Sequence, residues 1–190
     1  MGLLGTRGLL YRIEKEILYV LFGRRAYLCG YFRLPVGPFR QEVKQPVWEE
    51  KSIDTSLFID DDGTPYLYFV RFTDGNVIWV ARMTDDLMKI KTETLSQCVK
   101  AEAPWELLQA KVAEGPSVLK KNGTYYLIYS ANHYQNKGYG SGVMSTSKYT
   151  NGPWIKYSKN PLLQGVEGMG LVGTGHGALF NAKMAAGNTF

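Results

Sequence analysis

A segment of seventeen residues occurs twice in this chain, with the two copies sixty positions apart. The first copy is 53–69 and the second is 113–129. Four pairs of identical residues keep the same spacing in both: Gly63 and Gly123, Thr64 and Thr124, Tyr66 and Tyr126, Leu67 and Leu127. A unit that recurs at a fixed period predicts a fold built from stacked copies of one supersecondary motif.

Each copy has the pattern of a β-hairpin. Apolar, strand-like runs flank a polar turn, 60–63 in the first copy and 120–123 in the second. Both turns end in glycine, which supplies the positive φ that a tight turn needs. Further strands are predicted at 9–13, 18–22 and 77–83, and one short helix around 104–108. The 21 glycines and 13% aromatic content agree with strands joined by tight turns.

Several short strands in each repeat are typical of a β-propeller, in which units stack around an axis. A β-sandwich is the alternative all-β fold, but it would not account for the period. At sixty residues per unit, 190 residues supply roughly three blades. Propellers typically close with about four to eight blades. We therefore expect an incomplete propeller, whose open blade edges could also associate with a second copy.

Composition excludes several other classes of protein. The net charge of +5 is scattered over the chain, so no concentrated basic patch predicts a nucleic-acid partner. The chain has only two histidines, which excludes a site of several histidines. Cys29 and Cys98 lack metal-ligand spacing and are interpreted as buried free thiols. The N-terminal residues resemble neither a signal peptide nor a membrane span, so no membrane partner is expected and the compartment is left open.

Each copy opens with one acidic residue directly before an apolar run, Asp54 in the first and Glu114 in the second. Stacked units would bring these carboxylates together, and glycoside hydrolysis requires a pair of carboxylates. Glu114 lies between apolar residues and precedes Gly115-Pro116. In a partly apolar cleft its pKa should rise, as a general acid requires. Asp54 could instead cap its own backbone in a turn.

Two further groups of polar residues have different interpretations. Asp60-Asp61-Asp62 precedes a turn glycine and is replaced by Lys120-Lys121-Asn122 in the second copy, so we expect a solvent-exposed turn and no calcium loop. His176 lies about two periods after Asp54 and is flanked by glycines. We expect it near the same axis, although a histidine that only satisfies its loop is the alternative.

Three segments together resemble glycoside hydrolase family 43: 53–63, 114–117 and 173–177. That family contains β-xylosidases, α-L-arabinofuranosidases and related enzymes on a five-bladed β-propeller. The resemblance implies inverting hydrolysis of O-glycosyl bonds in xylose- or arabinose-containing oligosaccharides and polysaccharides. It implies that Glu114 is the general acid, that Asp54 modulates its pKa, and that His176 helps to hold an axial calcium ion through water. No cofactor is required, and calcium would be structural.

The resemblance covers about residues 36–181. We therefore expect 1–190 to be one incomplete propeller domain, with 1–35 as a divergent blade and 182–190 as a tail. The family's catalytic base is an aspartate of the first blade, and this chain has no aspartate before Asp54. The expected activity of the chain alone is accordingly weak or absent. The alternative is a non-catalytic carbohydrate-binding or scaffold protein on a broken propeller.

The expected partner is a xylo- or arabino-oligosaccharide. Three aromatic residues, Phe72, Trp105 and Tyr134, are candidates to line its binding site together with His176. Each aromatic residue could equally be a packing residue, because strands are rich in such side chains.

Overall fold

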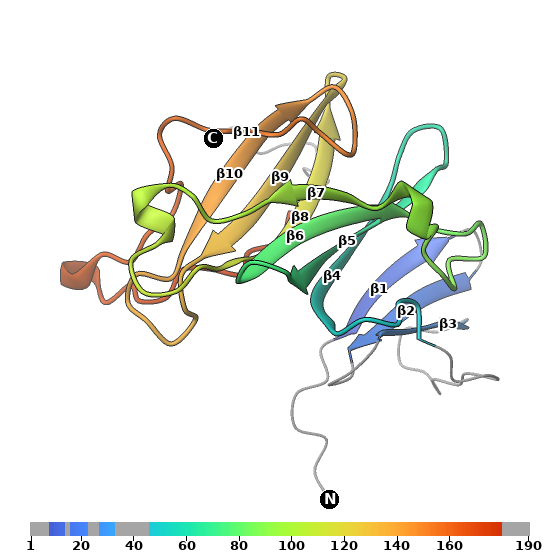
Figure 1. Ribbon diagram of the computed structural model, residues 1–190, viewed down its shortest axis with the longest axis horizontal. Coiled ribbons are helices and arrows are strands. Elements are labelled where there is room, and N and C mark those ends of the chain that lie inside the picture. The colour runs from blue at the N-terminus through green and yellow to red at the C-terminus, as the bar shows by residue number, and fades with distance from the viewer. Residues whose placement is uncertain (1–7, 14–15, 23–26, 33–45, 180–190) are drawn as a thin grey trace, which may run out of the picture.

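The computed structural model describes residues 8–13, 16–22, 27–32 and 46–179. In these ranges the named strands form three antiparallel sheets, and helical structure is limited to short 3₁₀ turns (Figure 1). The all-β fold class is thereby confirmed. Among the described residues there is no helix with the length and apolar character needed to cross a membrane.

Each sheet is formed by strands that follow one another along the chain. The first has the order β1 (Gly8–Ile13), β2 (Glu16–Phe22), β3 (Tyr27–Phe32). The second has the order β4 (Ser52–Ile59), β5 (Pro65–Phe72), β6 (Asn76–Arg82), β7 (Ser96–Val99). The third contains β8 (Ala113–Lys121), β9 (Thr124–Ala131), β10 (Gly140–Ser147) and β11 (Ile155–Lys156), again in sequential order. The 3₁₀ turns are η1 (Thr92–Thr94), η2 (Pro104–Glu106) and η3 (Glu167–Met169).

The two sequence copies form the first hairpins of the second and third sheets, β4–β5 and β8–β9. Both hairpins carry a β-bulge near the start of their first strand, between Ile53 and Ser56 and between Glu114 and Ser117. A bulge inserts an unpaired residue and re-aims the neighbouring side chains. Asp54 therefore lies within the irregularity of the first copy, and Glu114 directly precedes that of the second.

The core lies on both faces of β5. Leu67 and Phe69 point into one buried apolar cluster, and Tyr68 and Val70 point into another. Alternate side chains of a strand point to opposite faces, so β5 is a fully buried central strand. The second cluster also contains Leu127 and neighbouring residues of β9, and it therefore joins the second sheet to the third.

The turn at 60–63 has the predicted position, since the Gly63 N–H donates to the Asp60 carbonyl at 2.9 Å. Asp61 and Asp62 are exposed, as expected. The same prediction is wrong for Asp60, whose side chain is only 11% exposed. Its carboxylate accepts hydrogen bonds from Lys120 Nζ, at 2.7 Å, and from Tyr125 Oη. Asp60 and Lys120 occupy equivalent positions in the two copies, so their opposite charges pair across the repeat.

Two smaller expectations can also be compared with the structure. The short helix around 104–108 is present as the single 3₁₀ turn η2, which ends at Glu106. Cys98 is a free thiol whose pKa is raised by burial. The side chain of Cys29 lies outside the described part of the chain.

Candidate active site

Glu114 lies at the start of β8 and is only 9% exposed. Each of its carboxylate oxygens accepts one hydrogen bond. Tyr139 Oη donates to Oε1 at 2.9 Å, and Asn76 Nδ2 donates to Oε2 at 2.9 Å. Asn76 begins β6 of the second sheet and Tyr139 directly precedes β10 of the third, so the two contacts hold the carboxyl group from different segments.

Burial raises the pKa of Glu114, and the negative charge of Asp54 raises it further. The hydrogen bonds from Tyr139 and Asn76 and the proximity of His176 oppose this rise without cancelling it. A carboxyl group with a raised pKa keeps its proton at higher pH, which is the property of a general acid.

Asp54 lies in the bulge of β4 and has a φ of 55°. Aspartate is one of the few residues that tolerate this left-handed conformation. Its Oδ2 accepts a hydrogen bond from the Gly115 N–H at 3.1 Å. Asp54 is therefore attached to the residue that follows Glu114, so the bulges of the two copies are joined directly.

His176 approaches the same point from the segment after η3. Its Nδ1 lies 4.0 Å from Asp54 Oδ2, and its backbone N–H donates to Ser130 Oγ at 2.5 Å. A Cβ on Gly115 would lie 3.2 Å from His176 Nδ1, and Gly115 itself has a φ of 59°. Glycine at 115 thus meets two requirements at once: a left-handed backbone and close approach of the imidazole.

The structure brings three of the residues singled out from the sequence to one place. One ligand atom each from Asp54, Glu114 and His176 lies within 4.8 Å of the other two. Such a group could hold a cation, but calcium takes roughly six to eight oxygen ligands. Both oxygens of Glu114 already accept hydrogen bonds, and the third residue offers nitrogen. The donor set therefore fits a calcium ion poorly, and we assign the metal no step in the chemistry.

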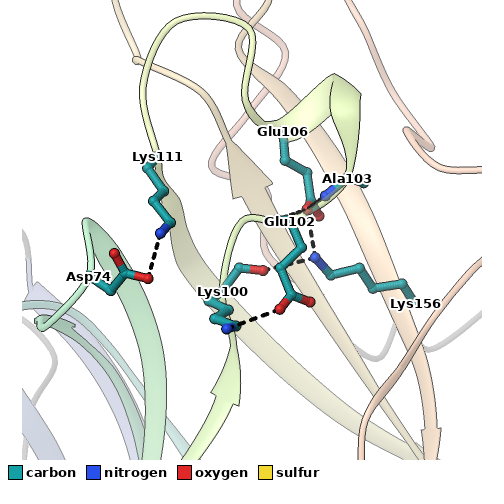
Figure 2. Close-up of polar contacts among 7 residues, drawn as sticks. All are labelled: Asp74, Lys100, Glu102, Ala103, Glu106, Lys111 and Lys156. Carbon is teal, nitrogen blue, oxygen red and sulfur yellow. Dashed lines mark hydrogen bonds and ion pairs between the residues drawn. The ribbon is translucent and has the colours of Figure 1, made fainter.

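Asn76 reaches Glu114 because the β5–β6 turn is fixed against the segment that enters β8. Lys111 Nζ pairs with Asp74 Oδ2 at 2.5 Å (Figure 2), and the Asn76 N–H donates to the Lys111 carbonyl at 3.0 Å. A Cβ on Gly75 would lie 2.0 Å from the same carbonyl oxygen. Only glycine can therefore occupy position 75 without moving the turn.

A second polar cluster fixes the loop before β8. Figure 2 shows Glu106, which is fully buried, in contact with Lys156 and with the backbone of Ala103. Lys156 Nζ lies 2.5 Å from Glu106 Oε2, and the Glu102 and Ala103 N–H groups donate to that oxygen at 2.7 Å. Burial raises the pKa of Glu106, but these hydrogen bonds lower it by more. The loop is thereby tied to β11.

The three predicted aromatic residues occupy different environments. Phe72 is 45% exposed and lies opposite Asn76 in the β5–β6 register, on the hairpin that contacts Glu114. Tyr134 is 65% exposed, and its ring stacks on that of His133. Trp105 packs against the core cluster, with its ring 6.1 Å from that of Tyr129. Contact of these residues with sugar stays a prediction, and packing already accounts for Trp105.

Sequence reasoning missed Asn76 and Tyr139, the two residues that hold Glu114. Asn76 had a signal, because Asp74-Gly75 before it is typical of a turn, but a turn sequence does not indicate which side chain the turn will contact. Tyr139 lies between two glycines outside both sequence copies, and no pattern distinguishes it from the other tyrosines. Its hydrogen bond depends on the pairing of β10 with β9 and of β9 with β8, which brings the start of β10 near the start of β8.

Comparison with known proteins gives consistent matches. The sequence profile of Glycosyl hydrolases family 43 matches residues 32–188. The chain is 29% identical to a beta-D-galactofuranosidase from Aspergillus niger, over 77% of this chain and 40% of that protein. It is 28% identical to the xylosidase/arabinosidase 43A of Humicola insolens, over 55% of this chain and 45% of that protein.

Solved structures extend this comparison. An endo-1,4-beta-xylanase from Bacteroides thetaiotaomicron is 67% identical, with a TM-score of 0.90 over 96% of this chain and 63% of that one. A thermostable family-43 glycoside hydrolase is 31% identical, with a TM-score of 0.81 over 89% of this chain and 59% of that one.

The chain thus spans less than half of the two curated relatives and about three fifths of the two solved structures. The structural likeness implies that part of a five-bladed β-propeller is present. With the profile match covering most of the sequence, the chain belongs to glycoside hydrolase family 43.

Proposed function

We propose that this chain supplies the general acid of a glycosidase that cleaves xylose- or arabinose-containing saccharides. The observation that carries the proposal is the nearly buried Glu114 carboxyl group, held by two hydrogen bonds with Asp54 beside it. The names of the relatives, which include xylosidase/arabinosidase and endo-1,4-beta-xylanase, support the class of sugar.

In this mechanism Glu114 donates its proton to the glycosidic oxygen of the leaving group. The charge of Asp54 keeps the proton on Glu114 until the bond begins to break. Once the proton has left, the hydrogen bonds from Tyr139 and Asn76 stabilise the carboxylate that remains, because bonds to a charged acceptor are stronger. Asp54 thus favours the protonated form of Glu114, and the hydrogen bonds from Tyr139 and Asn76 favour its carboxylate form.

Inversion requires a second carboxylate that activates water on the opposite face of the sugar, roughly 6.5–9.5 Å from the acid. The resemblance assigns this role to an aspartate that precedes Asp54, and the sequence contains none there. Losing a general base typically costs about 10²–10⁴-fold in rate. We therefore expect the chain by itself to hydrolyse slowly or not at all.

The test compares two aryl β-xylosides and two aryl α-L-arabinofuranosides, each pair with a nitrophenol and a dinitrophenol leaving group. Dinitrophenolate is a good leaving group that needs little help from an acid. Glu114→Gln should therefore abolish release of nitrophenol and spare most release of dinitrophenol. Glu102→Gln, which removes an exposed carboxylate, is the matched control. Equal losses on both leaving groups would contradict the role of Glu114 as the acid.

Azide provides a complementary test, because a small anion can take the place of water where the base is absent. Added azide should accelerate loss of the dinitrophenyl substrate and yield a glycosyl azide of inverted configuration. If azide has no effect and neither the chain nor Glu114→Gln shows turnover, the alternative is favoured: a protein that binds sugar without hydrolysing it. Isothermal titration with xylo-oligosaccharides would then measure the binding directly.

A further inference from the structure

A cavity of about 570 Å³ lies between the second and third sheets. Its lining combines tyrosine with charged and amide side chains, among them Asp60, Arg82, Glu93, Lys148, Tyr149 and Asn151. It has no part in the chemistry described above. We call it the far-face cavity.

The far-face cavity lies at the opposite end of β4 from the candidate active site. Asp54 lies near the first residue of this strand, whereas Asp60 directly follows its last residue. A strand rises about 3.3 Å per residue, so six residues separate the two points by about 20 Å. A monosaccharide bound there would not contact Glu114.

The lining is suited to a neutral, polyhydroxylated ligand. Its two acidic residues, Asp60 and Glu93, are balanced by two basic residues, Arg82 and Lys148. No excess of either sign therefore favours a phosphate, a nucleic acid or a cation. The exposed side chains of Glu93, Arg82 and Asn151 offer both donors and acceptors to hydroxyl groups.

An aromatic surface completes this chemistry. Tyr149 belongs to the lining and is 64% exposed, so one edge of the cavity has a ring that the protein leaves largely in water. Small-molecule sites combine aromatic side chains with a few placed polar groups, and tyrosine supplies an apolar face with a polar tip. The C–H groups of a pyranose or furanose ring fit such a face.

The walls are held in place by contacts that cross between the sheets. Asp60 of the second sheet binds Lys120 and Tyr125 of the third. The buried Tyr68 Oη donates to the Thr150 carbonyl at 2.6 Å, next to Tyr149. A site whose walls are fixed before binding loses less conformational entropy when a ligand enters.

We propose that the far-face cavity is a second carbohydrate-binding site, which takes a neutral pentose oligosaccharide about 20 Å from Glu114. The choice of pentose rests on the proposed function, whereas the existence of the site does not. Such a site would hold one part of a long polysaccharide on the protein while another part of the same polysaccharide lies at Glu114.

The experiment measures binding of xylohexaose and of the corresponding arabino-oligosaccharide by isothermal titration calorimetry. It uses the full chain with Glu114→Gln, so that no ligand is hydrolysed. Tyr149→Ala in that background should weaken binding about tenfold, equivalent to about 1.4 kcal/mol. Tyr149→Phe keeps the ring and should bind as the parent does. Tyr157→Ala removes a tyrosine that is 42% exposed and outside the cavity, so it should change nothing.

Three results would overturn the proposal: no binding of either saccharide, unchanged binding in Tyr149→Ala, or equal losses in Tyr149→Ala and Tyr157→Ala. The proposed function is tested separately, because aryl monosaccharides are too short to reach both sites. Tyr149→Ala without the Glu114 change should hydrolyse them at the parent rate. Loss of saccharide binding with unchanged aryl hydrolysis would therefore support both proposals. Binding without hydrolysis, even of the dinitrophenyl substrate with azide present, would support only this one.

Discussion

Replacing Glu114 by glutamine should make the folded chain more stable at neutral pH. Its carboxyl group is nearly buried and lies within 4.8 Å of Asp54, so its ionised form is repelled by that charge. At 4.8 Å two unit charges repel by about 0.9 kcal/mol in bulk water and by about 3.5 kcal/mol at an effective dielectric constant of ~20. We expect a gain of about 1–3 kcal/mol, because the two opposing hydrogen bonds persist. The Tyr139 hydroxyl can either donate or accept, so it can pair with either end of the glutamine amide.

The stability gained by Glu114→Gln should increase as the pH rises. The pKa of Glu114 is higher in the folded chain than the ordinary value of 4.5, so folding takes up protons between the two. The cost of charging Glu114 therefore appears as the pH rises through 4.5, and it is complete above the folded pKa. Below 4.5 the wild-type side chain is neutral in both states, and the advantage of glutamine should vanish.

Thermal unfolding of the two chains at pH 4 and pH 7.5 measures this effect. For a chain of this size, about 1 kcal/mol shifts Tm by roughly 2–4 °C, so Glu114→Gln should raise Tm by about 2–12 °C at pH 7.5. Glu102→Gln removes an exposed carboxylate and should shift stability by less than about 0.5 kcal/mol. In an Asp54→Asn background the gain should shrink, since the repulsion is already gone. A gain that is absent, or equal at both pH values, would refute the reasoning.

Four further predictions concern the charge of Asp54, the Lys156–Glu106 pair, bound metal and self-association. Asp54→Asn keeps a residue that tolerates a left-handed φ but removes the charge that raises the pKa of Glu114, so the alkaline limb of the rate profile should move to lower pH. An unmoved limb would contradict the role of Asp54. Lys156→Met should destabilise the chain by about 3–5 kcal/mol in urea unfolding, because it leaves the buried Glu106 carboxylate without its cation; a loss under about 1 kcal/mol would count against this pairing. EDTA should leave the rate of hydrolysis unchanged, and a Tm that rises with added calcium would show a structural ion instead. We expect self-association, because apolar side chains between 162 and 172, such as Leu162 and Val172, are exposed and sheet edges are open. A single monomer peak over a wide concentration range in size-exclusion chromatography would contradict this.

Much of the fold follows from local patterns. The period of sixty, the turn glycines at 63 and 123, and the alternating apolar runs are sufficient to predict the hairpins β4–β5 and β8–β9. The acidic residues Asp54 and Glu114 could be singled out for the same reason, because each opens a copy of the repeat. Equivalent positions in stacked units lie near one another, so repetition carries information about proximity.

What the repeat cannot specify is the set of contacts between residues that are not equivalent. Asp60 resembles its exposed neighbours in sequence, yet packing of one hairpin on the next places it against Lys120 and Tyr125. Asn76 belongs to an Asp-Gly-Asn turn and Tyr139 carries no distinguishing pattern, and neither is marked in the sequence as a partner of Glu114. Asn76 reaches Glu114 from the neighbouring sheet, and Tyr139 reaches it from the segment before β10 of the same sheet. The sequence by itself determined the strands, the turns and the acidic pair, because these depend on residue type and spacing. The pKa of Glu114, its two hydrogen-bond donors and the far-face cavity were decided only by tertiary structure, because burial and charge proximity depend on distances between segments remote in the chain.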